Sequence, residues 1–93
     1  MPLVNPSEIA CSLVKIPSWN LDGLVIRRTY QFHDFAEAMH FVNWVAQVAE
    51  DSNHHPDIDI RWNRVTLALT THDQGGLTNL DFEMAARCDK LAT

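Results

Sequence analysis

The segment from residue 57 to residue 70 reads DIDIRWNRVTLALT, and it decides the fold. Apolar and charged residues alternate along its first part. After Asn63 and Arg64, apolar residues alternate with threonine and alanine. A period of two is typical of a strand that has one buried and one wet face. We therefore predict two strands joined by a tight turn, and the alternation places Trp62 on the buried face with Ile58 and Ile60.

The residues before this hairpin predict further strands. Between Leu24 and Phe32 apolar and polar residues alternate again, and Arg28 is the one charged residue on the apolar side. This pattern predicts a half-buried antiparallel strand. A shorter strand is expected around Trp19 and Leu21.

Two helices are predicted on the N-terminal side of the hairpin. Asn5 is a good N-cap and Pro6 suits the first helical position, so a short helix should run from there to about Lys15. Asp34, with a glutamate three residues later, begins a second helix that runs to about Asp51. Its apolar stripe, at the 3.6-residue spacing of a helix, consists of Phe35, Ala38, Met39, Val42, Val45, Ala46 and Ala49.

A third helix is predicted after the hairpin. Thr78, with Asp81 three residues later, has the spacing of a capping box, and a Gly-Gly pair provides the turn before it. The resulting order is helix, one or two strands, helix, two strands, helix. That order is typical of an α+β fold with its helices on one face of an antiparallel sheet. The apolar side of the last helix comprises Leu80, Met84, Cys88 and Leu91.

The composition and charge of the chain limit the classes of protein to which it can belong. A chain of 93 residues with 46% hydrophobic residues has room for one core, so residues 1–93 are expected to form a single domain. The net charge of -5 argues against a nucleic-acid partner. Cys11 and Cys88 lack the spacing of a metal knuckle or a disulfide scaffold. With no secretory signal or membrane-spanning run, a cytoplasmic protein without a membrane partner is predicted.

Three histidines are the main chemical signal. His54, His55 and His72 fall on loops or strand ends, where side chains can converge outside the core. Surface histidines without a function are the plain alternative. A metal site completed by Glu50 or Asp81 is another, but adjacent histidines usually point in different directions, so no metal is predicted. Proton transfer near neutral pH suits imidazole better.

Several spacings taken together resemble those of the pterin-4a-carbinolamine dehydratases. The similarity extends from about Trp19 to Leu91, including the strand with Arg28 and the helix start at Asp34. The spaced pattern consists of Glu50, three residues, His54-His55-Pro56, five residues, Trp62, nine residues, His72, eight residues and Asp81.

This resemblance implies a fold and a reaction. The fold would be a four-stranded antiparallel sheet with three helices packed on one face, in a homodimer or homotetramer. The substrate would be a 4a-hydroxytetrahydropterin, from which water is removed to give the quinonoid dihydropterin, within pterin cofactor recycling. No cofactor or metal is implied. One general acid and one general base suffice for such a step.

The resemblance also implies roles for individual residues. His54 and His72 would carry the acid–base work, with the choice between acid and base open, and His55 would bind and position the pterin. Glu50 would orient a histidine or stabilise its charged form. The residues that bind the substrate would be Asp81, the backbone around Thr70 and Thr71, and Trp62. Asp81 could equally be only a helix cap. For Trp62 a core position is the stronger interpretation.

A second function remains open on the same resemblance. Animal members of this family also serve as dimerisation cofactors of a transcription factor through a helix surface. A protein-interaction module or transcriptional coactivator would not need three histidines together, whereas a dehydratase would. The sequence does not distinguish one pterin from another, or a dimer from a tetramer.

Overall fold

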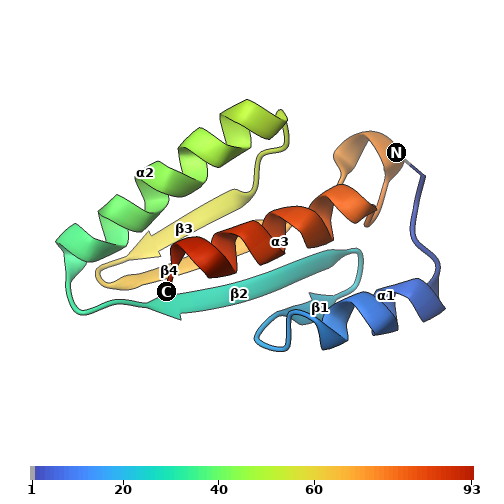
Figure 1. The fold of residues 1–93 in the computed structure, drawn as a ribbon, viewed down its shortest axis with the longest axis horizontal. Coiled ribbons are helices and arrows are strands. Elements are labelled where there is room, and N and C mark those ends of the chain that lie inside the picture. Colours follow the sequence, from blue (N-terminus) through green and yellow to red (C-terminus); the bar gives the residue numbers. More distant parts are fainter. Residues whose placement is uncertain (1) are drawn as a thin grey trace.

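The computed structural model describes residues 2–93 and contains four strands and three α-helices within that range. Every neighbouring pair in the sheet is antiparallel, and the strand order is β1-β2-β4-β3. The predicted α+β fold is therefore confirmed (Figure 1). In chain order the elements are α1 (Pro6–Val14), β1 (Asn20–Asp22), β2 (Val25–Gln31), α2 (Phe35–Ser52), β3 (Asp57–Arg61), β4 (Arg64–Leu69), the short 3-10 turn η1 (His72–Gln74) and α3 (Asn79–Leu91).

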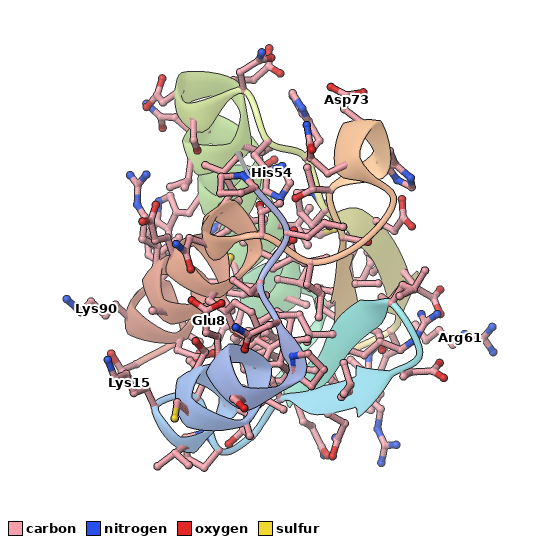
Figure 2. All side chains as sticks on the ribbon, turned by 90° about the vertical axis from the view of Figure 1, so that its right-hand side faces the viewer. Glu8, Lys15, His54, Arg61, Asp73 and Lys90 are labelled. Atoms are coloured by element: carbon pink, nitrogen blue, oxygen red, sulfur yellow. The ribbon has the colours of Figure 1, made fainter. Side chains whose placement is uncertain are left out.

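The helices form one layer and the sheet forms the other (Figure 2). Each helix begins at the cap that its sequence predicts. Asn5 and Thr78 are the caps of reciprocal capping boxes, and the Asp34 side chain accepts a hydrogen bond from the Glu37 amide. These caps satisfy amide groups that have no partner inside the helix.

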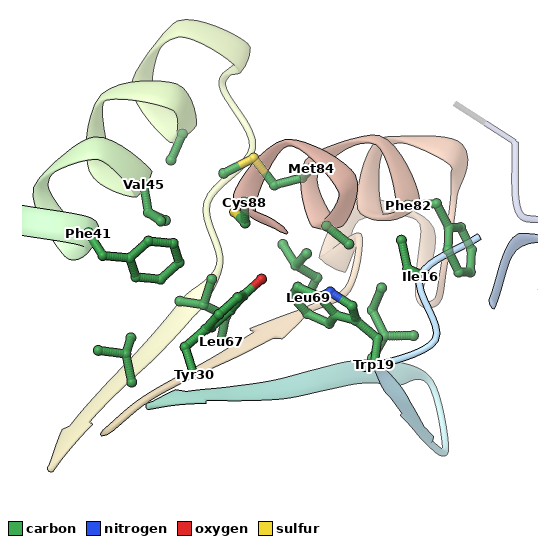
Figure 3. Close-up of a cluster of buried hydrophobic side chains, with 14 of the residues drawn as sticks. Ile16, Trp19, Tyr30, Phe41, Val45, Leu67, Leu69, Phe82, Met84 and Cys88 are labelled. Carbon is green, nitrogen blue, oxygen red and sulfur yellow. The ribbon is translucent and has the colours of Figure 1, made fainter. Parts of the chain in front are cut away.

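The core lies between the two layers (Figure 3). Val65, Leu67 and Leu69 of the inner strand β4 have no exposed surface, as their alternation predicts. Phe41 and Val45 of α2 pack over them, together with Met84 and Cys88 of α3. The opposite face of the sheet carries polar side chains, among them Thr29 and Thr66, whose hydroxyls are 2.8 Å apart.

Trp62 contradicts the predicted core position, because its side chain is 68% exposed. Arg61 pairs with Arg64 across the hairpin, so Trp62 and Asn63 are the two turn residues and the alternation ends one residue earlier. Trp62 adopts a left-handed backbone with φ 51°. The buried residue of the turn is instead Asn63, whose Nδ2 donates to the Phe32 carbonyl at 2.8 Å.

The predicted stripe of α2 is also partly wrong. Phe41, which that stripe leaves out, is buried, whereas Phe35 is half exposed and Ala46 is exposed. The buried line consists of Ala38, Phe41, Val45 and Ala49, which still has helical spacing. On β2, Leu24 was expected on the buried face but precedes the strand and is exposed.

Candidate active site

Three elements end at one edge of the fold and bring polar side chains together. They are the C-terminal end of α2, the segment that follows β4, and the N-terminal end of α3. Figure 2 looks onto this edge, where His54 lies between the end of α2 and the turn that carries Asp73. A shallow depression of about 190 Å³ opens here, lined by Asn53, His54, His55, Thr70, Thr71, His72 and Asp73.

The end of α2 turns the chain back toward α3. Asn53 is the C-cap and takes a left-handed backbone conformation (φ 51°), which asparagine adopts more readily than most residues. The His54 amide donates to the Ala49 carbonyl at 3.1 Å, and Pro56 prevents a further helical turn. This reversal directs His54 inward and leaves His55 exposed.

His54 is held by a buried carboxylate. Its Nε2 lies 2.6 Å from Oδ1 of Asp81, and its side chain is only 9% exposed. Asp81 has no exposed surface, and its Oδ2 accepts hydrogen bonds from the Thr71 hydroxyl and the Thr78 amide, each at 2.9 Å. Asp81 therefore closes the capping box of α3 and orients His54 with the same carboxylate.

His55 has a carboxylate partner of its own, in solvent. Its Nε2 lies 2.5 Å from Oε2 of Glu50, one turn back on α2, and both side chains are more than half exposed. An exposed pair of this kind contributes little stability, about 0–1 kcal/mol. Glu50 can nevertheless set the orientation of the His55 ring.

His72 is the first residue of η1 and is exposed. Within residues 2–93 its ring forms no hydrogen bond or ion pair, so it is free to contact a ligand. It lines the same depression as His54 and His55, although it lies 17 positions after His55 in the sequence. The fold thus gathers the three histidines that the sequence singled out.

The structure does not bring every predicted site residue to the depression. Trp62 is in the β3–β4 turn, at the opposite end of the hairpin from the histidines. Thr70 and Thr71 do line the depression, but the backbone of Thr71 already forms hydrogen bonds, because its amide donates to the Gly76 carbonyl and its carbonyl accepts from the Gln74 amide. Thr70 donates its hydroxyl to the Leu24 carbonyl at 2.7 Å.

Thr78 belongs to this cluster, and the sequence pattern had placed it only as a cap. Its hydroxyl lies 2.8 Å from that of Thr71, both inside the protein. The capping-box spacing of Thr78 and Asp81 is visible in the sequence. That spacing does not indicate that Thr71 and His54 both contact the Asp81 carboxylate. That contact depends on the loop between β4 and α3.

None of the other hollows in residues 2–93 gathers three histidines, although one of about 320 Å³ is lined by His40 and Glu37. A groove of about 380 Å³ between α2 and the C-terminal residues is larger but has no histidine among its lining residues, which include Trp44 and Leu91. Across residues 2–93, no three His, Cys, Asp or Glu side chains converge as a metal-binding set. In the same range, no helix is both long and apolar enough to span a membrane.

The fold and the site define a small α+β protein in which three histidines line one depression and two of them contact carboxylates. Residues 2–91 match the family model described as pterin 4 alpha carbinolamine dehydratase. The chain belongs to this family, whose enzymes are hydro-lyases.

Similar proteins agree with this assignment. A protein of Sulfurisphaera tokodaii is 47% identical over the full length of both chains, and one of Chloroflexus aurantiacus is 52% identical over 98% of each. Both are provisionally named pterin-4-alpha-carbinolamine dehydratases.

Solved structures share the fold. A crystal structure from Brucella melitensis, described as a transcriptional coactivator/pterin dehydratase, covers 98% of this chain and 99% of its own, with a TM-score of 0.94 at 34% identity. A pterin dehydratase-like protein, identified as a RuBisCO assembly factor in the alpha-carboxysome, has a TM-score of 0.70 at 26% identity, covering 81% and 89% of the two chains. Members with this fold thus carry names from more than one class of function.

Proposed function

We propose that this protein dehydrates a 4a-hydroxytetrahydropterin to the quinonoid dihydropterin by histidine acid–base catalysis in the depression. The observation that carries the proposal is the convergence of His54, His55 and His72 on one depression. Family membership supports the dehydration itself. The histidines account for how it proceeds.

The reaction needs two proton transfers. The C4a–O bond breaks when the hydroxyl gains a proton and departs as water. The neighbouring ring nitrogen loses its proton, and the electron pair of that N–H bond forms the new C=N bond. His54 and His72 supply the acid and the base, each of which contributes about 10²- to 10⁴-fold.

The remaining groups bind and orient the pterin. His55, directed by Glu50 at 2.5 Å, contacts the ring from the exposed side of the depression. The amide-like edge of the pterin pairs with the backbone of Thr70, since the peptide groups of Thr71 bond within the 71–76 turn. Asp81 acts through His54, because it is buried and its contacts are all with protein groups.

The setting is part of the same proposal. The protein recycles a pterin cofactor in the cytoplasm as a homodimer or homotetramer. Strands β1 and β3 are the edges of the sheet within one chain, and unpaired edges favour association. Trp62, exposed on the β3–β4 turn, would reach a pterin only if it came from another copy.

A protein-interaction role is the alternative, and α2 is the observation that favours it. Trp44 and Phe35 on this helix are large apolar side chains that are each about half exposed, at 52% and 50%, so both are available for contact with a protein partner. Variants of these two residues that keep full dehydratase activity but lose a protein partner would support that role as an addition.

The test is dehydration of 4a-hydroxytetrahydropterin generated in situ, followed by the absorbance of the quinonoid product. The reaction proceeds without a catalyst, so the uncatalysed rate is subtracted. We expect a rate that is proportional to protein concentration. A rate equal to the background at micromolar protein would overturn the proposal.

A further inference from the structure

A continuous set of hydrogen bonds links the start of α3 to His54. It begins at the Leu80 amide, which donates to Oγ1 of Thr78 at 3.3 Å, and continues to the Thr71 hydroxyl at 2.8 Å. From Thr71 it reaches Oδ2 of Asp81 at 2.9 Å, and Oδ1 of Asp81 contacts Nε2 of His54 at 2.6 Å. Thr71, Thr78, Asp81 and His54 are all buried, so water does not compete for these contacts.

The direction of each hydrogen bond in this set follows from its two ends. A carboxylate can only accept, so Thr71 must give its single proton to Asp81. Thr71 then has no proton for Thr78, and Thr78 must donate to Thr71. Thr78 in turn accepts from the Leu80 amide, which can only donate. Each hydroxyl thus donates once and accepts once.

The same reasoning assigns the proton on His54. Oδ2 of Asp81 is occupied by Thr71 and by the Thr78 amide, and Oδ1 faces Nε2 of His54. Nε2 must therefore carry a hydrogen, and in the neutral ring Nδ1 is then the unprotonated nitrogen. Nδ1 forms no hydrogen bond within residues 2–93, and no fully buried polar side-chain atom there lacks a partner, so Nδ1 has some solvent-accessible surface.

We infer that Thr71 and Thr78 are positioning residues, which act through Asp81 to hold neutral His54 as the Nε2–H tautomer and so make Nδ1 the atom that exchanges a proton with substrate. The claim about the tautomer concerns the protein alone. Its effect on catalysis rests on the proposed function.

The Asp81→Asn variant tests the tautomer directly. Two donors, the Thr71 hydroxyl and the Thr78 amide, meet the Oδ2 position, so the oxygen of the new amide must occupy it. Its NH2 group then faces His54 and donates to Nε2, which forces the proton onto Nδ1. Nitrogen-15 NMR of the imidazole, at the alkaline end of its titration, should show Nε2–H in the native protein and Nδ1–H in the variant.

Activity provides a second readout. In the Ser-His-Asp triad the equivalent change imposes the wrong tautomer and lowers kcat about 10⁴-fold. Here we expect kcat to fall by about 10²- to 10⁴-fold with KM little changed, because Asp81 does not touch the substrate.

The Thr71→Val variant keeps the shape of the side chain and the backbone, and it remains informative if Asp81→Asn fails to fold. Without the Thr71 donor, only the Thr78 amide holds Oδ2, so the carboxylate can turn its Oδ1 away from Nε2 in part of the molecules. Those molecules no longer have Nε2–H fixed, so we expect a measurable Nδ1–H population and a roughly 10-fold lower kcat. Thr71→Ser restores the hydroxyl and should restore both readouts. Thr66→Val is the matched control, since it removes a threonine hydroxyl on the open face of the sheet and should change neither.

The outcomes separate the two proposals. An Nδ1–H ring in the native protein, or Nε2–H retained in Asp81→Asn, would overturn the inference whatever the activity. A native protein with the Nε2–H tautomer but no dehydratase activity would overturn the proposed function and leave the tautomer assignment standing.

Discussion

His54 and His72 differ in how far the protein constrains them. The His54 ring is buried against Asp81, whereas the His72 ring is exposed and forms no hydrogen bond within residues 2–93. A substitution at position 72 therefore tests chemistry almost free of structural effects. A substitution at position 54 also removes the hydrogen-bond partner of the buried Asp81 carboxylate, which costs about 1–3 kcal/mol of folding free energy.

We predict that His72→Ala lowers kcat for dehydration by about 10²- to 10⁴-fold while the thermal unfolding midpoint stays within about 2 °C of the native value. His54→Ala should lower kcat to a similar extent and also lower the unfolding midpoint. Steady-state kinetics and thermal melts of both variants measure these effects. If both variants kept native kcat above the uncatalysed background, neither imidazole could be the acid or the base.

The sequence predicted which residues to examine better than it predicted their contacts. Motif spacing identified the histidines and Asp81, because such a spacing can be recognised without a structure. It did not reveal that the Thr71 and Thr78 hydroxyls converge on Asp81, since that depends on the path of the 70–78 loop. Arg28, the apparent exception on the apolar side of β2, has two partners that its place in the sequence does not show. Its Nη1 donates to Oδ1 of Asp89, 61 positions later, at 2.7 Å, and its Cζ lies 4.2 Å from the centre of the Tyr30 ring.

The positions of the strands and caps were predicted well because their signals are local, although Ile58, predicted on the buried face, is 38% exposed on the edge strand β3. The alternation of β4 corresponds to a strand buried between two neighbours, and the three caps depend on residues three positions apart. The buried face of α2 was predicted less accurately, because most residues from Phe35 to Ala49 are apolar and could belong to a buried stripe. The choice depends on how the helix crosses the sheet, and the sequence of α2 does not contain that information.

The β3–β4 turn provides a prediction at the scale of an element. Asn63 and Phe32 are joined by two hydrogen bonds, one from Nδ2 to the Phe32 carbonyl and one from the Phe32 amide to the Asn63 carbonyl. Asn63→Ala keeps only the second and leaves a buried carbonyl without this donor, so it should lower the free energy of unfolding by about 1–3 kcal/mol. Chemical denaturation measures the change.

Trp62→Ala is the control from the same turn. Its side chain is exposed, and alanine meets the same left-handed backbone, so the free energy of unfolding should change by about 0.5 kcal/mol or less. Equal destabilisation by the two variants would show that the turn itself, and not the Asn63 side chain, connects the hairpin to β2.

Asp89 joins distant parts of the whole molecule. Its Oδ1 accepts hydrogen bonds from Nε1 of Trp19 at 3.0 Å, from Arg28 at 2.7 Å and from the Tyr30 hydroxyl. One carboxylate thus connects α3 with β2 and with the segment that follows α1. Two neighbouring groups have raised pKa values. The pKa of Cys88 is raised to about 12, mainly by burial and to a smaller extent by the Asp89 charge. The pKa of Tyr30 is raised well above its usual value, mainly by burial and to a smaller extent by the hydrogen bond to Asp89.

These two raised pKa values predict loss of stability at alkaline pH. In the unfolded chain a cysteine titrates near pH 8.5 and a tyrosine near pH 10, at about their ordinary values. Because the folded state holds both groups protonated to higher pH, their contribution is fully present below about pH 8.5. This contribution to the free energy of unfolding decreases as the pH rises toward the folded pKa of each group. The decrease is about 1.4 kcal/mol per pH unit for each group that is deprotonated in the unfolded chain but still protonated in the folded protein. The free energy of unfolding should therefore decrease from about pH 8.5 and decrease more steeply above about pH 10.

Replacing Cys88 isolates the first part of this loss. Cys88→Ala creates a small cavity and lowers stability at every pH. It should nevertheless flatten the decline between about pH 8.5 and pH 10, the window that lies above the ordinary pKa of cysteine and below that of tyrosine. Cys11→Ala, at an exposed position on α1, controls for the removal of a thiol and should leave the slope as it is in the native protein. Chemical denaturation at half-unit pH steps measures the three slopes. If Cys88→Ala declined as steeply as the native protein in this window, the alkaline loss would have to come from groups other than the buried thiol.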